Sequence, residues 1–268
     1  MRLIVLGSGS KGNSTYIETE YSKILIDSGL SLRDTEARLD LIGVNPNELD
    51  GVIITHEHGD HIKSVGTLSR KYNLNVFAHQ EIWDALLKRA GHIALPNQKQ
   101  ITNEMFAIND IDFVPFDVPH DAIHCLGYSV YNKDNKITFA TDLGYVTDEI
   151  LNALYKSDLA ILESNYDPEL MRKSRKYPEY LKQRITSERG HLSNPASAEV
   201  LRKLLHQNVR GVVLAHISEE TNTPELAFNS ALDILTAEGA ELHKDIHVAV
   251  APQHNVGSMY KLKNRNTN

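Results

Sequence analysis

The stretch Thr55-His56-Glu57-His58-Gly59-Asp60-His61 places three imidazoles and the carboxylate of Asp60 within six residues. It continues the apolar run of residues 51–55, which is typical of a buried strand, and it leads into residues 62–72, whose apolar spacing is typical of a helix. Clustered imidazoles repel one another once protonated, whereas neutral imidazole and carboxylate together are preferred ligands of zinc and related divalent ions. The stretch therefore predicts a metal-binding loop between a strand and a helix.

One such loop can supply ligands to two metal ions. In an extended turn His56 and His58 point the same way, while Asp60 and His61 can reach a second point a few ångströms away. Further ligands are expected from the ends of other strands, because each ion still lacks partners. Three residues directly follow apolar runs that read as strands: His120, Asp142 and His216.

The remaining pattern predicts strands and helices in both halves of the chain. The expected strands cover residues 3–6, 15–19, 23–27, 75–78, 112–118, 127–131, 136–140, 159–162, 211–215 and 247–250. The expected helices run from the N-cap Ser31 to Ile42 and over residues 81–90, 148–156, 195–206 and 224–237, with helical stretches before residue 184. This order favours an α/β fold with two mixed sheets flanked by helices, a four-layer αββα sandwich that forms a single domain over residues 1–268.

Composition excludes several classes of protein. No apolar run approaches the roughly 18–20 residues that cross a bilayer, so we expect no membrane association. The single cysteine, Cys125, excludes an internal disulfide and fits a cytoplasmic location. Lys and Arg number 28 against 35 Asp and Glu, and the net charge of −7 argues against binding nucleic acid through the whole surface.

The segment Gly7-Ser-Gly9-Ser-Lys-Gly12 matches a dinucleotide-binding pattern, but its context does not. That pattern requires a helix directly after the glycines, and a strand-like run follows here. We therefore interpret the segment as a glycine-rich connection between strands, in which Ser10 and Asn13 are candidates for lining a site.

Positive charge is concentrated in one segment of this acidic chain. Residues 171–189 carry a net charge of +5, and Tyr177 and Tyr180 lie among the basic residues. A groove that binds a polyanion and stacks bases needs this combination, although a solvated helix face has the same pattern. The candidate contacts to substrate are Arg172, Lys173, Arg175 and Lys176.

The histidine-rich motif and the three later ligands, in this order, resemble the metallo-β-lactamase superfamily over nearly the whole chain. Within it the chain resembles the YycJ/WalJ family, through GSGSKGNS at residues 7–14, LESN at 162–165, RGHLSN at 189–194 and AHIS at 215–218. The resemblance implies that His56, His58 and His120 bind one metal and that Asp60, His61 and His216 bind the other. It also implies that Asp142 bridges both, that a hydroxide between the metals attacks the substrate, and that Asp60 orients this hydroxide.

Differences from other branches of the superfamily reduce the number of reactions to be expected. Asp142 stands where the best-known β-lactamases carry Cys, and His58 stands where the oxygen-reducing di-iron relatives carry Glu. Only 73 residues separate Asp142 from His216, too few for the inserted domain of the β-CASP nucleases. LESN replaces the HEAT motif of the branch that processes tRNA ends. The resemblance thus implies a phosphodiesterase, and most closely a 5′-to-3′ DNA exonuclease.

Residues 189–194 resemble the loop on the substrate side in this family. His191 is a candidate to protonate a leaving oxygen or hold a phosphate. Ser193 and Asn194 are candidates for phosphate contacts, and residues 194–195 could instead start the next helix. Of the other histidines, His79 lacks ligand spacing, and His124 and His254 are candidates for supporting the ligands.

Two alternatives remain open from the residues alone. The same site could hydrolyse a small ester, a thioester or a cyclic phosphodiester. The protein could also be a regulatory module whose metals only hold loops together. His and Asp ligands suit Zn, Mn and Fe comparably, so the expected cofactors are two divalent ions of this group. The sequence defines neither protein partners nor the oligomeric state.

Overall fold

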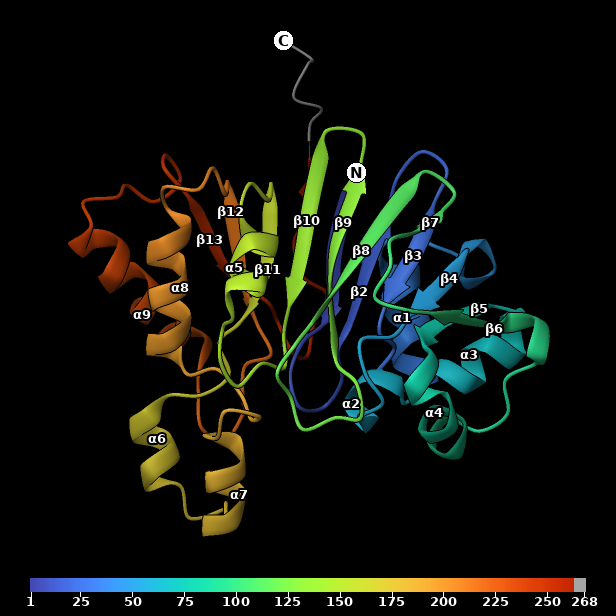
Figure 1. Cartoon of the computed structure of the whole chain (residues 1–268), viewed down its shortest axis with the longest axis horizontal. Helices are drawn as coiled ribbons and strands as arrows, with labels where there is room; N and C mark the ends of the chain where they lie inside the picture. Colours follow the sequence, from blue (N-terminus) through green and yellow to red (C-terminus); the bar gives the residue numbers. More distant parts are fainter. Residues whose placement is uncertain (263–268) are drawn as a thin grey trace.

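A computed structural model describes residues 1–262 of the chain and has two mixed, seven-stranded sheets packed face to face between layers of helices (Figure 1). This arrangement confirms the predicted αββα sandwich. No helix among the described residues is long and apolar enough to cross a membrane.

The first sheet has the order β14-β1-β2-β3-β4-β5-β6. Strands β14, β1, β2 and β3 pair antiparallel, and β3 to β6 pair parallel. The strands are β1 (Arg2–Gly7), β2 (Ser14–Glu18), β3 (Lys23–Ile26), β4 (Gly51–Ile53), β5 (Asn75–His79), β6 (Gln98–Ile101) and β14 (Met259–Lys261).

The second sheet has the order β13-β12-β11-β10-β9-β8-β7 and the same division. Strands β7 to β10 pair antiparallel, and β10 to β13 pair parallel. The strands are β7 (Phe106–Ile108), β8 (Ile111–Asp117), β9 (Leu126–Asn132), β10 (Asn135–Ala140), β11 (Leu159–Glu163), β12 (Gly211–Ala215) and β13 (His247–Val250).

Helices cover the outer face of each sheet. The first sheet is covered by α1 (Leu32–Leu41), α3 (Val65–Tyr72) and α4 (Trp83–Ala90), and the second by α5 (Asp148–Leu154), α8 (Asn194–Leu204) and α9 (Pro224–Ala237). The short helices α6 (Pro168–Lys173) and α7 (Glu179–Ile185) extend away from the sandwich at the lower edge in Figure 1.

The alternation of side chains along the strands explains why the sandwich has separate cores. In β1, Leu3 and Val5 pack between the sheets, whereas Ile4 packs against the helices. In β12, Val213 lies between the sheets and Leu214 faces the helices. Successive side chains in a strand point to opposite faces, so a strand that is apolar at every position is covered on both sides.

Two details differ from the expectation. The helix expected over residues 62–72 is divided into α2 (Gly59–Ile62) and α3, because the backbone where they meet bonds to Ser28. The N–H of Ser28 donates to the carbonyl of His61, and the N–H of Ser64 donates to the carbonyl of Ser28. The short strands β6, β7 and β14 were not predicted. Each is an edge strand of its sheet and has only three or four residues, so its hydrophobic signal is weak.

The topology brings the predicted ligands to one edge of the sandwich. The loop with His56 follows β4, and Asp142, Glu163 and His216 lie at or just after the ends of β10, β11 and β12, which run parallel. Strand β8 runs in the same direction, because both β8 and β10 are antiparallel to β9, and His120 follows it. The carboxyl ends of parallel strands are where open α/β sheets bind ligands.

Gly29 lets this loop pack closely against the connection after β3. A Cβ atom on Gly29 would lie 1.5 Å from the carbonyl oxygen of Asp60, a distance that requires the backbone to move. Gly59, in the same loop, has open space around the position of a Cβ atom.

We therefore predict that Gly29→Ala lowers the free energy of unfolding by roughly 1–3 kcal/mol, because the added methyl group overpacks the site. Gly59→Ala serves as the matched control and should change it by less than about 0.5 kcal/mol. Urea unfolding monitored by circular dichroism measures both values. Equal stability of the two variants would contradict the tight packing.

Candidate metal centre

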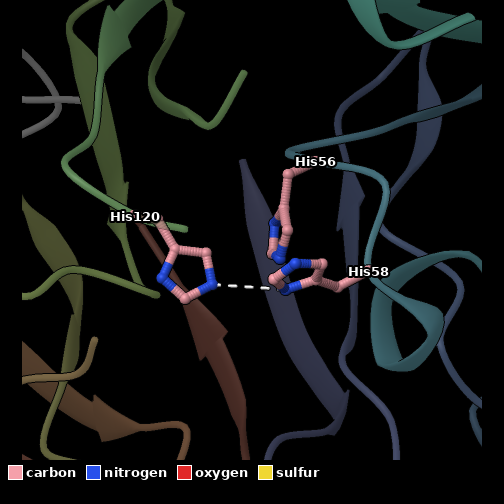
Figure 2. Close-up of side chains that lie close together, drawn as sticks. All are labelled: His56, His58 and His120. Carbon is pink, nitrogen blue, oxygen red and sulfur yellow. Dashed lines mark hydrogen bonds between the residues drawn. The ribbon is translucent and has the colours of Figure 1, made fainter. Parts of the chain in front are cut away.

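The seven predicted ligands converge in space. Ligand atoms within 4.8 Å of one another form two groups, one of His56, His58 and His120 and one of Asp60, His61 and His216. Asp142 lies between the groups, within the same distance limit of His56 and His61 and also of His216. Figure 2 shows His56 and His58 extending from the loop after β4 toward His120, which approaches from the second sheet.

The first group is a cluster of imidazole nitrogens. The Nε2 atom of His120 lies 3.3 Å from the Nδ1 atom of His58 and 4.0 Å from Oδ1 of Asp142. His56 and His120 are almost completely buried, and His58 is partly exposed. The three rings therefore enclose one point from two sheets and leave it open to solvent on the side of His58.

The second group contains carboxylate and imidazole. The Oδ2 atom of Asp60 lies 3.6 Å from Nε2 of His61 and 3.5 Å from Nε2 of His216. Asp142 lies 3.3 Å from both rings, with Oδ2 toward His61 and Oδ1 toward His216. A single carboxylate thus has one oxygen near each ring.

The buried ligand atoms fit a cation because several have no other partner. The Nε2 atoms of His56 and His216 and the Oδ2 atom of Asp142 are buried and make no hydrogen bond to the described residues. Leaving buried polar atoms unpaired costs about 1–3 kcal/mol each, so proteins seldom do so without a function. Nitrogen and oxygen atoms that converge in this way provide the ligands that zinc, manganese and iron bind.

Glu163 holds two of the histidines and was not predicted as a site residue. Its Oε1 atom lies 2.8 Å from Nδ1 of His191 and 2.7 Å from Nδ1 of His216, and its Oε2 atom accepts from the backbone N–H groups of Leu143 and Leu192. A proton on Nδ1 of His216 leaves Nε2 free to bind a metal. The available signals were its place in the LESN segment of residues 162–165 and its position at the end of the wholly buried strand β11.

Asp27 supports His61 in the same way. Its Oδ2 atom lies 2.8 Å from Nδ1 of His61, and its carboxylate also accepts from the backbone N–H and hydroxyl of Thr55. Asp27 follows β3 and is almost completely buried. A carboxylate behind a metal-binding imidazole fixes the tautomer and the direction of the ring.

Asp121 is a further residue that sequence reasoning missed. Its Oδ1 atom is buried without a hydrogen-bond partner among the described residues and lies 3.4 Å from Nε2 of His120. Its Oδ2 atom pairs with Arg184 on α7. Asp121 therefore connects the first ligand group to the helix that extends beyond the sandwich.

The backbone at the strand ends has unusual geometry. Asp27, Asp142 and His216 have φ angles of 60°, 61° and 56°. Residues other than glycine seldom adopt this left-handed region, and Asp and His tolerate it better than most. Such residues cluster at functional sites, where the surrounding structure holds them in place.

The predicted residues on the substrate side occupy different positions. His191 lies beside the centre, with its ring centroid 5.1 Å from that of His120 and 5.0 Å from that of His216. The amide of Asn13 lies 3.3 Å from Oδ2 of Asp60 and 3.0 Å from Nε2 of His61, and Ser10 is exposed nearby in the chain.

Two of these residues, at the start of α8, serve the fold directly. The hydroxyl of Ser193 accepts from the N–H of Ala196 and caps α8. Asn194 is buried and bonded to Ser164 and Asn222. Their roles as phosphate contacts stay predictions.

The basic residues lie on the projecting segment that contains α6 and α7. Arg172, Lys173, Arg175 and Lys176 are all exposed. Lys173 pairs with Glu169 on the same helix, and Lys176 pairs with Glu220. Farther along the segment, Arg189 donates to the carbonyl oxygen of His120, so the basic segment is attached to the metal-binding residues.

The two ligand groups differ in protonation. Burial lowers the pKa of His56, His58 and His120, so these rings are neutral. Burial disfavours the charged form of Asp60 as well, but the attraction of His61 is the main cause that lowers the pKa of Asp60 to about 2. Burial opposes charge on His61 and His216 as well, yet the attraction of Asp142 raises their pKa values well above the usual value. Before a cation binds, the second group holds protons that the first group lacks.

We therefore predict that the Asp60 group loses its metal at a higher pH than the three-histidine group. Protons compete for His61 and His216 as the pH falls, whereas His56, His58 and His120 accept protons only at lower pH. Dialysis between about pH 8 and pH 5 followed by metal analysis should show two steps of loss.

Two variants assign these steps. Asp60→Asn should remove the step at higher pH and keep the other, and His58→Ala should do the reverse. Loss of all metal in one step from the unmodified protein would contradict the difference between the groups.

The chain is similar in sequence to known proteins. Residues 22–217 match the family described as beta-lactamase superfamily domain. Exodeoxyribonuclease YycJ of Bacillus anthracis is 37% identical over 237 residues, which cover 88% of this chain and 89% of the relative. Exodeoxyribonuclease WalJ of Streptococcus pneumoniae strain R6 is 39% identical over 227 residues, which cover 83% and 84%.

Solved structures confirm the fold. The metallo-beta-lactamase fold protein YhfI from Bacillus subtilis superposes with a TM-score of 0.73 over 97% of this chain and 99% of that one, at 16% identity. PqqB from Methylobacterium extorquens, solved with bound Zn²⁺, gives a TM-score of 0.68 over 98% and 100%, at 15% identity. The chain therefore belongs to the beta-lactamase superfamily and, within it, to the family of YycJ and WalJ.

Proposed function

We propose that this protein is a metal-dependent hydrolase that cleaves phosphodiester bonds in DNA, removing nucleotides from the 5′ end. The observation that carries this proposal is the convergence of two ligand groups around the shared carboxylate of Asp142. The relatives at 37% and 39% identity are named exodeoxyribonucleases, and the match covers most of each chain. The proposal assigns catalysis to one domain over residues 1–268.

The two ligand groups would hold two divalent ions. His56, His58 and His120 would bind the first, Asp60, His61 and His216 the second, and Asp142 both. Divalent ions in such a site lower the pKa of water toward neutrality and neutralise negative charge on a phosphoryl oxygen. Asp60 would also accept a hydrogen bond from the attacking water, because its pKa of about 2 keeps it ionised.

His191 is proposed to donate a proton to the leaving oxygen. Its Nδ1 atom lies 2.8 Å from Oε1 of Glu163. Burial opposes ionisation of the Glu163 carboxyl, but the attraction of His191 is the main cause that lowers the pKa of Glu163 to about 2. The ionised carboxylate holds the ring in one direction and leaves Nε2 for the substrate. The side chain of His191 is 20% exposed, so it can meet a bound chain at the edge of the centre.

The projecting segment is proposed to bind the DNA backbone. Its exposed basic side chains and its attachment to His120 through Arg189 bring positive charge next to the ligands. Arg172 and Arg175 form no ion pair with the described residues, so their charges are available to phosphates. A polyanion gains from such contacts, whereas a small ester does not reach them.

The first test of this function uses Asp142→Asn and His58→Ala. Asn tolerates the φ angle of 61° at residue 142 and removes the charge, and both variants should lose at least about a hundredfold in hydrolysis. End-labelled DNA measures the reaction: a 5′ label should be released at once, while strands labelled at the 3′ end shorten step by step.

The exposed His92 provides the control, since His92→Ala should retain full activity. Circular dichroism verifies that the variants fold. Turnover retained in both ligand variants would exclude this centre as the catalyst, and preference of the unmodified protein for single esters over DNA would favour an esterase.

The second test reverses the charge of the basic segment. Changing Arg172, Lys173, Arg175 and Lys176 to Glu should weaken DNA binding and reduce its dependence on salt by about one unit of log–log slope for each phosphate that the segment no longer neutralises. Hydrolysis of a small chromogenic phosphodiester should stay unchanged, because that substrate touches only the centre.

A matched control reverses four exposed charges elsewhere on the chain: Arg33, Lys99, Lys203 and Lys244. Both variants change the net charge equally, so a specific binding surface predicts weaker binding only in the first. An equal effect in the two variants, or an equal effect on both substrates, would contradict the proposed binding surface.

A further inference from the structure

A second cluster of histidine and carboxylate lies outside the metal centre, where the two sheets approach each other. His79 ends β5 in the first sheet, and Glu81 follows it in the 3-10 turn Gln80–Ile82. Asp117 ends β8 in the second sheet, and His124 lies in the loop before β9. Ligand atoms of His79, Glu81 and His124 lie within 4.8 Å of one another, and none of them belongs to the groups around Asp142.

We propose that His79, Glu81 and His124 bind a third divalent metal ion of the zinc type. Two imidazoles and a carboxylate form a ligand set that zinc binds in proteins, with water in the fourth position. Bonds of about 2.0–2.1 Å in a tetrahedron place ligand atoms roughly 3.4 Å apart. The Nδ1 atom of His124 already lies 3.3 Å from Oε2 of Glu81.

Asp117 prepares His124 for this role. Its Oδ1 atom lies 3.0 Å from Nε2 of His124, on the side of the ring away from Glu81. A hydrogen bond from Nε2 to this carboxylate puts the proton there and leaves the lone pair of Nδ1 for a metal. His61 and His216 in the metal centre have the same arrangement, in which a carboxylate contacts one ring nitrogen and the other nitrogen faces the ion site.

His79 supplies the second imidazole from the protein interior. It is 3% exposed, and burial lowers its pKa, so the ring is neutral and able to bind a metal. Its only hydrogen bond among the described residues is a contact of 3.3 Å in which Nδ1 accepts from the N–H of Glu81. The ring stacks on that of His124, with 3.7 Å between centroids and 18° between the ring planes. Because a metal lies in the plane of each imidazole that binds it, the more exposed His124 must turn out of this stack before both rings reach one ion.

This ion would stabilise the loop that carries a ligand of the metal centre. His124 lies four residues after His120, and the N–H of Ile123 between them donates to Glu57 in the histidine-rich loop. A metal that joins β5 to this loop would connect the two sheets beside the catalytic residues. We therefore assign the third site to structure, separate from the hydrolysis proposed above.

The test counts zinc ions in the folded protein. Protein stripped with a chelator, reloaded with ZnCl₂ and separated from free metal should contain about three zinc ions per chain. His124→Ala should contain about two, the ions of the metal centre. Glu81→Ala, at an exposed side chain, gives the same result by a change that leaves the interior intact.

A control variant and the crystallographic position of the third ion complete the test. His92→Ala removes an exposed histidine elsewhere and should retain the full zinc content. Crystals soaked in ZnCl₂ should show anomalous scattering between His79 and His124. Equal zinc content in the unmodified protein and in His124→Ala, or no anomalous peak at this cluster, would each overturn the proposal, and His124 would then be an imidazolium between two carboxylates.

Discussion

The structure depends on carboxylates that are buried beside imidazoles at the edge where strands of both sheets end. Asp27, Asp142 and Glu163 are almost completely buried, and an isolated carboxylate in such surroundings would be strongly unfavourable. Each is stabilised by ring nitrogens, at 2.8 Å for Asp27 with His61 and 2.7 Å for Glu163 with His216. These contacts also fix which nitrogen of each ring carries the proton, so the other nitrogen points at a common space. The arrangement that stabilises the charges thus creates a site for cations.

The fold delivers these groups through its repeated topology. Each sheet has an antiparallel half and a parallel half, and the parallel halves end at the same edge. Charge is unfavourable in the middle of a strand that is buried on both faces, so charged side chains collect near the strand ends. Asp142 and His216 follow strands β10 and β12, and their left-handed backbone directs these side chains toward the centre. Most of the ligands therefore lie in buried segments just after rigid strands, whereas the basic candidates for substrate contacts lie on an exposed segment with short helices.

Three connections link the surface to the centre. Arg184 pairs with Asp121, Arg189 bonds to the carbonyl oxygen of His120, and Glu57 accepts from Ile123. The loop of residues 120–124 thus contacts the basic segment on one side and the histidine-rich loop on the other. Binding of a polyanion to the segment and binding of a metal to the His79 cluster would both act on this loop. His120 therefore lies where the basic segment, the metal centre and the His79 cluster come together.

The amino-acid sequence by itself determined the ligand-rich loop at residues 55–61, the alternation of strands and helices, and the apolar strands that precede His120, Asp142 and His216. These features are visible because ligand type, spacing and hydrophobic period are local properties. Only the tertiary structure decided that Asp27, Asp121 and Glu163 belong to the site, and that His79 lies against His124. Apart from Glu163 in the LESN segment, these residues are single side chains outside any motif, and, apart from His120 beside Asp121, their partners are tens of residues away in the sequence. Their roles arise from the pairing of strands and the packing of two sheets, which bring distant strand ends within hydrogen-bonding distance.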